Sequence, residues 1–130
     1  MKYLSLEEVY AIHLQMIKIG GGRNDIHDFS LLHSAVERPR ASFAGRDLYL
    51  TIWSKSAALL HSLVKNHPFD DGNKRTAFYS TKRFLFLNGY NLHPSLPDTL
   101  RFMVSVDVQN LSLKQISSWL KSHSLPLRPS

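Results

Sequence analysis

The sequence predicts an all-α fold, and three observations support that prediction. Apolar residues recur at three- and four-residue steps through most of the chain, which is the period of one buried helix face. Glycine and proline interrupt this pattern and divide it into separate helices. The chain has 130 residues, of which 43% are hydrophobic, and a chain of this length forms one domain with a sufficient core. We therefore expect a single compact helical domain over residues 1–130.

The first two helices are predicted from their end signals. Ser5 and Glu8 have the spacing of a capping box, so the first helix begins after Ser5. It is expected to end at the three glycines of residues 20–22, which are poor helix formers. Asp28 is a suitable N-cap for a second, shorter helix, and Pro39 ends that helix.

The middle of the chain is expected to contain a loop and the two longest helices. Residues 39–49 lack a helical period and predict a loop or a short β-hairpin. Residues 50–65 have the apolar face of a long central helix. A further long helix is predicted over residues 73–88, with Gly89 as its left-handed cap.

The last part of the chain predicts two more helices. Residues 90–96 are expected to form a loop, and Pro97 fits the first turn of the helix that follows. Ser112 and Gln115 form a second capping box before the last helix. Residues 122–130 contain two prolines and are expected to be a frayed tail.

Composition excludes several classes of protein. The absence of cysteine excludes disulfides, thiolate zinc sites and a cysteine nucleophile. No apolar run approaches the roughly 20 residues of a membrane span, and Glu7 and Glu8 interrupt any signal-peptide pattern. A cytoplasmic protein without a membrane partner is expected. The net charge of +6 suggests nucleic acid, but the basic residues are scattered and no recognition helix stands out, so direct nucleic-acid binding is not expected.

One polar segment lies between the two longest predicted helices, and its end is suited to a phosphate group. The N-terminus of a helix presents unpaired N–H groups and the positive end of the helix dipole. Gly72 lets the backbone approach a ligand closely. Asn73 is expected to cap the helix and to donate its amide to an oxyanion, while Lys74 and Arg75 add positive charge. These four residues therefore predict a phosphate-binding site.

The same segment also supplies a candidate base and a candidate metal ligand. Asp71 offers hard oxygen ligands of the kind that hold Mg²⁺ together with substrate phosphates. Histidine is the side chain best suited to a general base at neutral pH, which makes His67 the candidate base. Lys65 is a candidate for the phosphate clamp, although a solvated cation at a helix end is the simpler interpretation. Each residue alone has a structural explanation, and it is their combination that predicts catalysis.

This segment resembles the loop of the Fic/Doc family. That loop runs His-Pro-Phe, any residue, Asp or Glu, Gly, Asn, Gly or Lys, and Arg, and residues 67–75 match at every fixed position. The preceding helix and the stretches at residues 37–40 and 87–90 extend the resemblance over nearly the whole chain. It implies the Fic fold, with a flap over residues 39–47 that docks an extended segment of the target by strand addition. The flap residues implied are Arg40, Ala41, Ser42 and Phe43.

Two departures indicate the branch of the family. Lys74 and Phe78 stand where adenylyl-transferring members carry Gly and a second Arg, and both resemble the death-on-curing (Doc) toxins. The resemblance implies a protein kinase that transfers the γ-phosphate of ATP to a Ser/Thr hydroxyl of a translation factor, elongation factor Tu, and so arrests protein synthesis. ATP and Mg²⁺ are the implied cofactors. His67 would be the base and Asp71 the Mg²⁺ ligand.

Two alternatives remain open. The chain is also compatible with a protein adenylyltransferase that transfers AMP, or with a non-catalytic helical module that binds an antitoxin or nucleic acid. A degenerate copy would not be expected to keep His67, Asp71, Asn73 and Arg75 together. None of the three glutamates follows a Ser or Thr by four residues, as the inhibitory helix of many adenylyl-transferring members requires. The resemblance therefore implies a separate antitoxin as partner, whose C-terminal segment folds onto an apolar groove.

Overall fold

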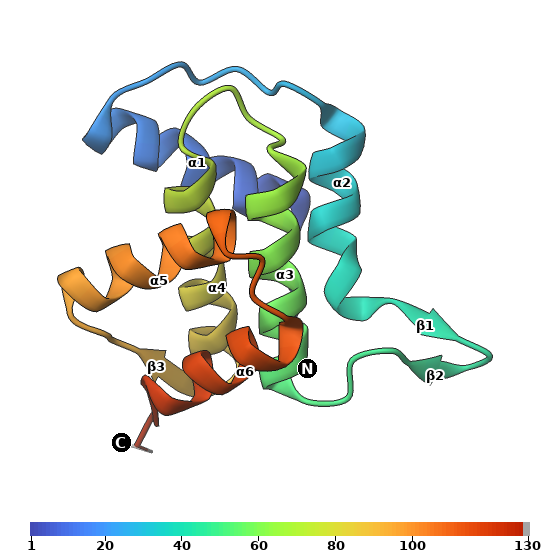
Figure 1. Cartoon of the computed structure of the whole chain (residues 1–130). Helices are drawn as coiled ribbons and strands as arrows, with labels where there is room; N and C mark the ends of the chain where they lie inside the picture. The colour runs from blue at the N-terminus through green and yellow to red at the C-terminus, as the bar shows by residue number, and fades with distance from the viewer. Residues whose placement is uncertain (129–130) are drawn as a thin grey trace.

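The predicted helical architecture is confirmed in the computed structural model, which describes residues 1–128 (Figure 1). Within that range the chain forms six α-helices, one 3₁₀ turn and two small antiparallel sheets. In chain order these are α1 (Leu6–Gly20), α2 (Phe29–Glu37), η1 (Arg38–Arg40), β1 (Ser42–Phe43), β2 (Arg46–Asp47), α3 (Ile52–Asn66), α4 (Asn73–Leu87), β3 (Tyr90–Leu92), α5 (Leu96–Val108), α6 (Leu113–Ser122) and β4 (Ser124–Pro126).

The expected helix ends are mostly confirmed, and they show why the helices begin where they do. The capping boxes at Ser5 and Ser112 and the N-cap at Asp28 form as predicted. α3 begins at Ile52 rather than at residue 50, because the Thr51 side chain accepts a hydrogen bond from the Ser54 N–H and caps the helix. Asn73 does not cap α4. The N-cap is Gly72, in a left-handed conformation with a φ of 78°.

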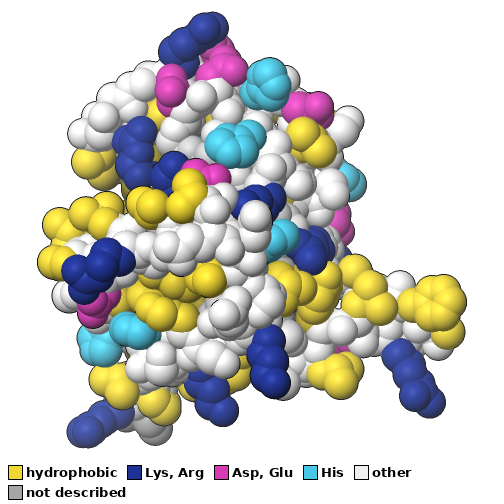
Figure 2. Space-filling view, in the orientation of Figure 1, with side chains coloured by type: hydrophobic (Ala, Val, Ile, Leu, Met, Phe, Trp, Pro, Cys, Tyr) yellow, Lys and Arg dark blue, Asp and Glu magenta, His cyan; other side chains and the backbone are white. Residues whose placement is uncertain are grey.

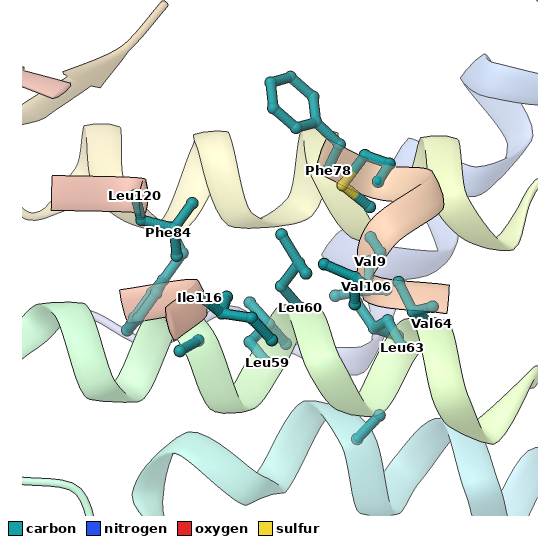
Figure 3. Close-up of a cluster of buried hydrophobic side chains, with 14 of the residues drawn as sticks. Val9, Leu59, Leu60, Leu63, Val64, Phe78, Phe84, Val106, Ile116 and Leu120 are labelled. Atoms are coloured by element: carbon teal, nitrogen blue, oxygen red, sulfur yellow. The ribbon is translucent and has the colours of Figure 1, made fainter. Parts of the chain in front are cut away.

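Helix α3 lies at the centre of the molecule, between α2, α4 and α6 (Figure 1). It is no longer than α1 or α4, since each has 15 residues. Its central place follows from its composition, because small residues such as Ser56 and Ala57 allow neighbouring helices to approach closely. Large aliphatic and aromatic side chains from α1, α3, α4, α5 and α6 meet around it in one core (Figure 3).

Two predictions about the second half of the chain were wrong. Residues 90–96 were expected to be a loop and residues 122–130 a frayed tail, but β3 and β4 pair as antiparallel strands. The Leu127 N–H also donates to the Gly89 carbonyl, at 2.9 Å. The physical reason is a pairing between segments more than 30 positions apart, so neither segment shows it in its own sequence. The last part of the predicted tail, residues 129–130, lies outside the described range.

The expected hairpin forms at residues 42–47 and projects from the body of the molecule (Figure 1). Ala44 and Gly45 form its turn with positive φ angles. Lys55, which is only 3% exposed, holds its base: the ammonium donates to the Pro39 carbonyl and pairs with Asp47 at 3.1 Å. No helix within residues 1–128 is long and apolar enough to cross a membrane.

A half-buried histidine on α3 makes the stability depend on pH. Arg38 donates to Nδ1 of His61, at 3.1 Å. Burial, and then the positive charges of Arg38 and Lys65, lower the pKa of His61 below 6.5. As pH falls below the unfolded pKa of about 6.5, the unfolded chain takes up this proton first, so the folded state loses stability.

We expect His61→Asn to reduce this pH dependence, because the amide oxygen still accepts from Arg38 but does not titrate. Urea unfolding of the native and variant proteins at pH 7 and pH 5 measures it. The matched control is His33→Asn, which removes an exposed histidine. An equal loss of stability on acidification in the native protein and His61→Asn would contradict this expectation. Part of the pH dependence should remain in the native protein and in His61→Asn, because both keep His13, whose pKa is also lowered.

Candidate active site

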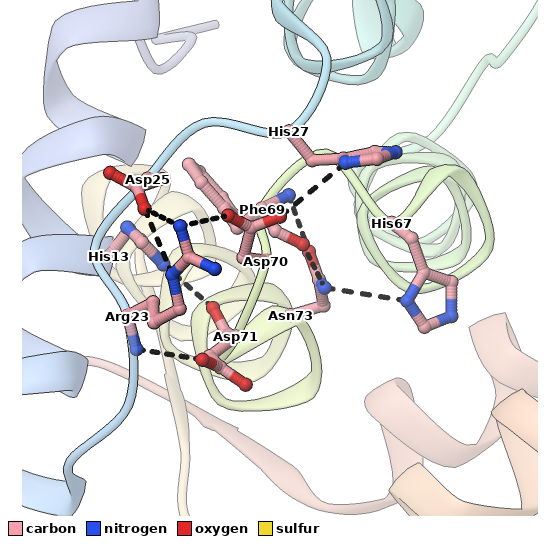
Figure 4. A network of polar contacts seen from close by, with 9 residues as sticks. All are labelled: His13, Arg23, Asp25, His27, His67, Phe69, Asp70, Asp71 and Asn73. Atoms are coloured by element: carbon pink, nitrogen blue, oxygen red, sulfur yellow. Dashed lines mark hydrogen bonds and ion pairs between the residues drawn. The ribbon is translucent and has the colours of Figure 1, made fainter.

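The candidate site is the loop between α3 and α4, residues 67–72 (Figure 4). His67 ends α3 in a left-handed conformation, with a φ of 47°. Its ring lies apart from Phe69, Asp70 and Asp71, with one nitrogen toward Asn73 (Figure 4), and its Nε2 lies 4.0 Å from Oδ1 of Asp107 on α5. The side chain is 58% exposed, so a hydroxyl of another molecule has access to it.

The loop is fixed by two residues that face inward. Phe69 is 2% exposed and stacks on the His13 ring, with centroids 3.6 Å apart. Oδ1 of Asn73 accepts from the Phe69 N–H at 3.0 Å, and Nδ2 of Asn73 donates to the Phe69 carbonyl at 2.8 Å. The same Nδ2 lies 3.4 Å from Nδ1 of His67. The Asn73 amide therefore holds the loop in shape and lies against the histidine.

The N-terminus of α4 differs from the other helix starts in the described chain. α1, α2, α3, α5 and α6 each have a side chain that accepts from a first-turn N–H, whereas α4 has none. Its first hydrogen bond within the helix is donated by the Thr76 N–H to the Gly72 carbonyl. The N–H groups of Asn73, Lys74 and Arg75 precede it. An uncapped helix start next to a glycine is suited to an anion.

Asp71 is held by a segment that sequence reasoning did not connect with the loop. Residues 21–28, between α1 and α2, lie along the loop and form an isolated bridge between Ile26 and Phe69. The Arg23 N–H donates to Oδ2 of Asp71 at 2.7 Å. Nε2 of His13 donates to the Asp71 carbonyl at 2.8 Å, and burial lowers the pKa of His13, which favours the neutral ring. Two hydrogen bonds from distant parts of the chain thus orient Asp71.

Gly22 permits this close contact, and we expect Gly22→Ala to disturb it. Gly22 has a φ of 112°, and an added Cβ would lie 2.9 Å from the Asp71 Cβ. Alanine is strained at this φ and would also push Asp71 away, so a cost of about 1–3 kcal/mol is expected. Denaturant unfolding measures it. The matched control is Gly45→Ala in the hairpin, where φ is also positive but nothing lies within 4 Å. Equal costs for both variants would show that backbone strain alone, and not contact with Asp71, is responsible.

The lysines of the site converge on Asp107, a residue that the sequence interpretation missed. Nζ of Lys74 pairs with Oδ2 of Asp107 at 3.1 Å. Lys65 is not a solvated helix-end cation: it donates to the Asp107 carbonyl and, at 2.7 Å, to Oδ1 of Asn110. The hydrogen bond that Lys74 donates to the Asp107 carboxylate is the main reason why the pKa of Asp107 lies below its ordinary value. One signal was available, since an acid in the last turn of a helix opposes the helix dipole.

The remaining predicted residues lie apart from this cluster. The Arg75 guanidinium donates to the Met16 and Gly21 carbonyls, at 2.8 and 3.1 Å, and so binds the C-terminal end of α1. Arg40 belongs to η1, Ala41 follows it, and Ser42 and Phe43 form β1 of the hairpin. The hairpin is held at the first turn of α3 by Lys55, while His67 is at the other end of that helix, about 20 Å away at 1.5 Å per residue. The structure does not bring the flap to the loop.

Few acidic side chains are available for a metal ion. Within residues 1–128 no group of three or more His, Asp or Glu residues is arranged to hold one. Asp71 has one carboxylate oxygen engaged by the Arg23 N–H. A single carboxylate fits Mg²⁺ only when phosphate oxygens complete the coordination, so the donor set favours a metal that arrives with a nucleotide.

The site thus combines a helical domain with an exposed histidine and an uncapped helix start at the two ends of one loop. The model of the Fic/DOC family matches residues 3–85, and the chain belongs to this family. The chain is similar to a protein named Toxin Doc from Mycolicibacterium smegmatis, with 49% identity over 72 residues, which span 55% of each chain. It is also similar to a protein named Protein kinase doc from Escherichia phage P1, with 28% identity over 121 residues, or 93% of this chain and 94% of the relative.

Proposed function

We propose that the chain is a Doc-type toxin and a protein kinase, which transfers the γ-phosphate of ATP to a Ser/Thr hydroxyl of a translation factor and so arrests protein synthesis. Elongation factor Tu is the proposed target, by family resemblance. The observation that carries the proposal is the exposed His67 beside the uncapped start of α4. The names of the two relatives, Toxin Doc and Protein kinase doc, support a toxin and a protein kinase.

The residues of the loop fit a nucleotide with its metal. The N–H groups at the start of α4, with Lys74 beside them, offer donors and positive charge to phosphate oxygens. Asp71 would hold Mg²⁺ together with those oxygens. The bound metal would supply neutralisation of phosphate charge. The Arg75 guanidinium, which donates to the Met16 and Gly21 carbonyls and lies near Gly72, would add positive charge to this end of α4.

Within this arrangement His67 would take the proton from the target hydroxyl. The ring would accept this proton while the hydroxyl oxygen attacks the γ-phosphorus of ATP. The bond from that phosphorus to the bridging oxygen would break, and ADP would leave. Asn73 keeps the ring in place, because its amide is locked to the backbone of Phe69. The first-turn N–H groups of α4 and Lys74 would stabilise charge on the transferred phosphoryl group.

An antitoxin is the proposed partner, and an apolar groove offers it a site. The groove has a volume of about 460 Å³ and lies between α1, α4 and α5, with Lys74 and Arg75 at its edge. Exposed apolar side chains such as Leu96, Leu100 and Val104 line it, and hydrophobic side chains gather over α5 (Figure 2). An amphipathic helix can place its apolar face in such a groove. Binding there would place the antitoxin next to the phosphate site.

The experiment that tests the proposed reaction uses ATP labelled at either the α- or the γ-phosphate. The protein is incubated with elongation factor Tu, Mg²⁺ and each form of ATP, and the label on the target is measured. Transfer from the γ position alone supports the kinase. Transfer from the α position would overturn it in favour of adenylylation. Absence of transfer from both, with retained antitoxin binding, would indicate a non-catalytic module.

A further inference from the structure

We propose that Asp107 is a positioning residue, which fixes the Lys74 ammonium beside His67 for the transfer reaction. This inference rests on the proposed kinase function. Asp107 comes from the last turn of α5, more than 30 positions from the loop in sequence, and it lies against Lys65, His67 and Lys74.

The two carboxylate oxygens of Asp107 face different side chains. Oδ2 binds Nζ of Lys74 at 3.1 Å, while Oδ1 faces Nε2 of His67 at 4.0 Å, beyond hydrogen-bond distance. The carboxylate therefore sits between the two groups and binds the lysine. The Asp107 side chain is 25% exposed and that of Lys74 45% exposed, so the carboxylate is partly covered while the ammonium stays open to a ligand.

The last turn of α5 is itself fixed in place. Lys65, at the end of α3, donates to the Asp107 backbone carbonyl and to Oδ1 of Asn110. These bonds supply a cation at the C-terminal end of α5, where carbonyl groups lack partners within the helix. The acid at this position is unfavourable for the helix dipole, and Lys65 and Lys74 offset that cost. The contacts run from α3 through α5 to Lys74 on α4.

A phosphate-binding lysine needs such a partner because its ammonium sits on a flexible four-carbon stem. In protein kinases of another fold, a carboxylate from a separate helix holds the phosphate-binding lysine, and the pair must form for activity. Asp107 and Lys74 offer the same chemistry from α5 and α4. Lys74 is thereby directed to the side of the loop where His67 is exposed.

The test compares Asp107→Asn with Asp98→Asn, a matched control on the same helix whose carboxylate pairs with Arg101. We expect Asp107→Asn to lower kcat for phosphate transfer about 10- to 100-fold, by analogy with side chains that orient the ligands of a metal, with a smaller change in the KM for ATP. Asp98→Asn should leave both unchanged. Asp107→Glu should restore part of the loss, because a carboxylate returns.

A second measurement reads the position of Lys74 without activity. The rate of Lys74 acetylation by acetic anhydride, followed by mass spectrometry, should rise in Asp107→Asn and not in Asp98→Asn, since the ammonium loses its ion pair. In a Lys74→Ala background, Asp107→Asn should have little further effect on transfer.

Any of three results in Asp107→Asn would overturn the inference. The first is an unchanged rate of Lys74 acetylation, and the second is an unchanged kcat. The third is faster transfer with tighter ATP binding, which would mean that the carboxylate competes with phosphate for Lys74. Failure of the proposed function looks different. In that case the native protein transfers no phosphate, although Lys74 acetylation still rises in Asp107→Asn. The ion pair would then position Lys74 without a role in phosphate transfer.

Discussion

Replacing His67 by alanine is expected to lower phosphate transfer by about 10²- to 10⁴-fold, the usual contribution of a general base. No other histidine takes its place next to the start of α4 in the described structure, since His13 is buried under Phe69 and His27 pairs with Asp70. The rate of γ-phosphate transfer measures the effect. Arrest of growth on expression of the protein gives a second reading that does not depend on the identity of the target.

The matched control is His27→Ala, which removes another exposed histidine beside the same loop. Because His67 has a positive φ, His67→Asn is tested as well, since asparagine adopts this conformation readily and cannot act as a base. Both His67 variants should unfold at temperatures close to that of the native protein. Transfer at the native rate by either of them would show that the base is another group.

Replacing Phe69 by alanine is expected to have the largest effect on stability, about 3–5 kcal/mol. The Phe69 ring is 2% exposed and stacks on His13, so its removal leaves a cavity between the loop and α1. The Phe69 backbone also carries both hydrogen bonds of the Asn73 amide. A loosened loop should therefore reduce catalysis beyond the loss of folded protein, and transfer is compared at equal concentrations of folded protein.

Phe86→Ala is the control for this prediction, because Phe86 is 49% exposed and leaves no closed cavity. Urea unfolding of both variants gives the difference in the free energy of unfolding. If Phe69→Ala cost no more than Phe86→Ala, the loop would not depend on its buried ring. The stacking of Phe69 on His13 would then contribute little to the free energy of unfolding.

The sequence by itself determined the features that depend on neighbouring residues. The helices follow from apolar periodicity, and their starts at Ser5, Asp28 and Ser112 follow from hydrogen bonds that span three residues. The residues of the loop were identified for the same reason, because their types and order lie within one short segment. Their proposed roles await the experiments above.

Only the tertiary structure decided which distant residues meet. The pairing of β3 with β4, the contact of Arg23 with Asp71, and the position of Asp107 beside Lys74 all join segments far apart in the chain. Asn73, the first residue of α4, was assigned the wrong contacts, because its amide bonds to the backbone of Phe69 instead of capping α4. Hydrogen bonds within a helix connect residues three or four positions apart and are visible in a sequence pattern. Contacts between elements depend on how the core packs the helices, and no local pattern specifies them.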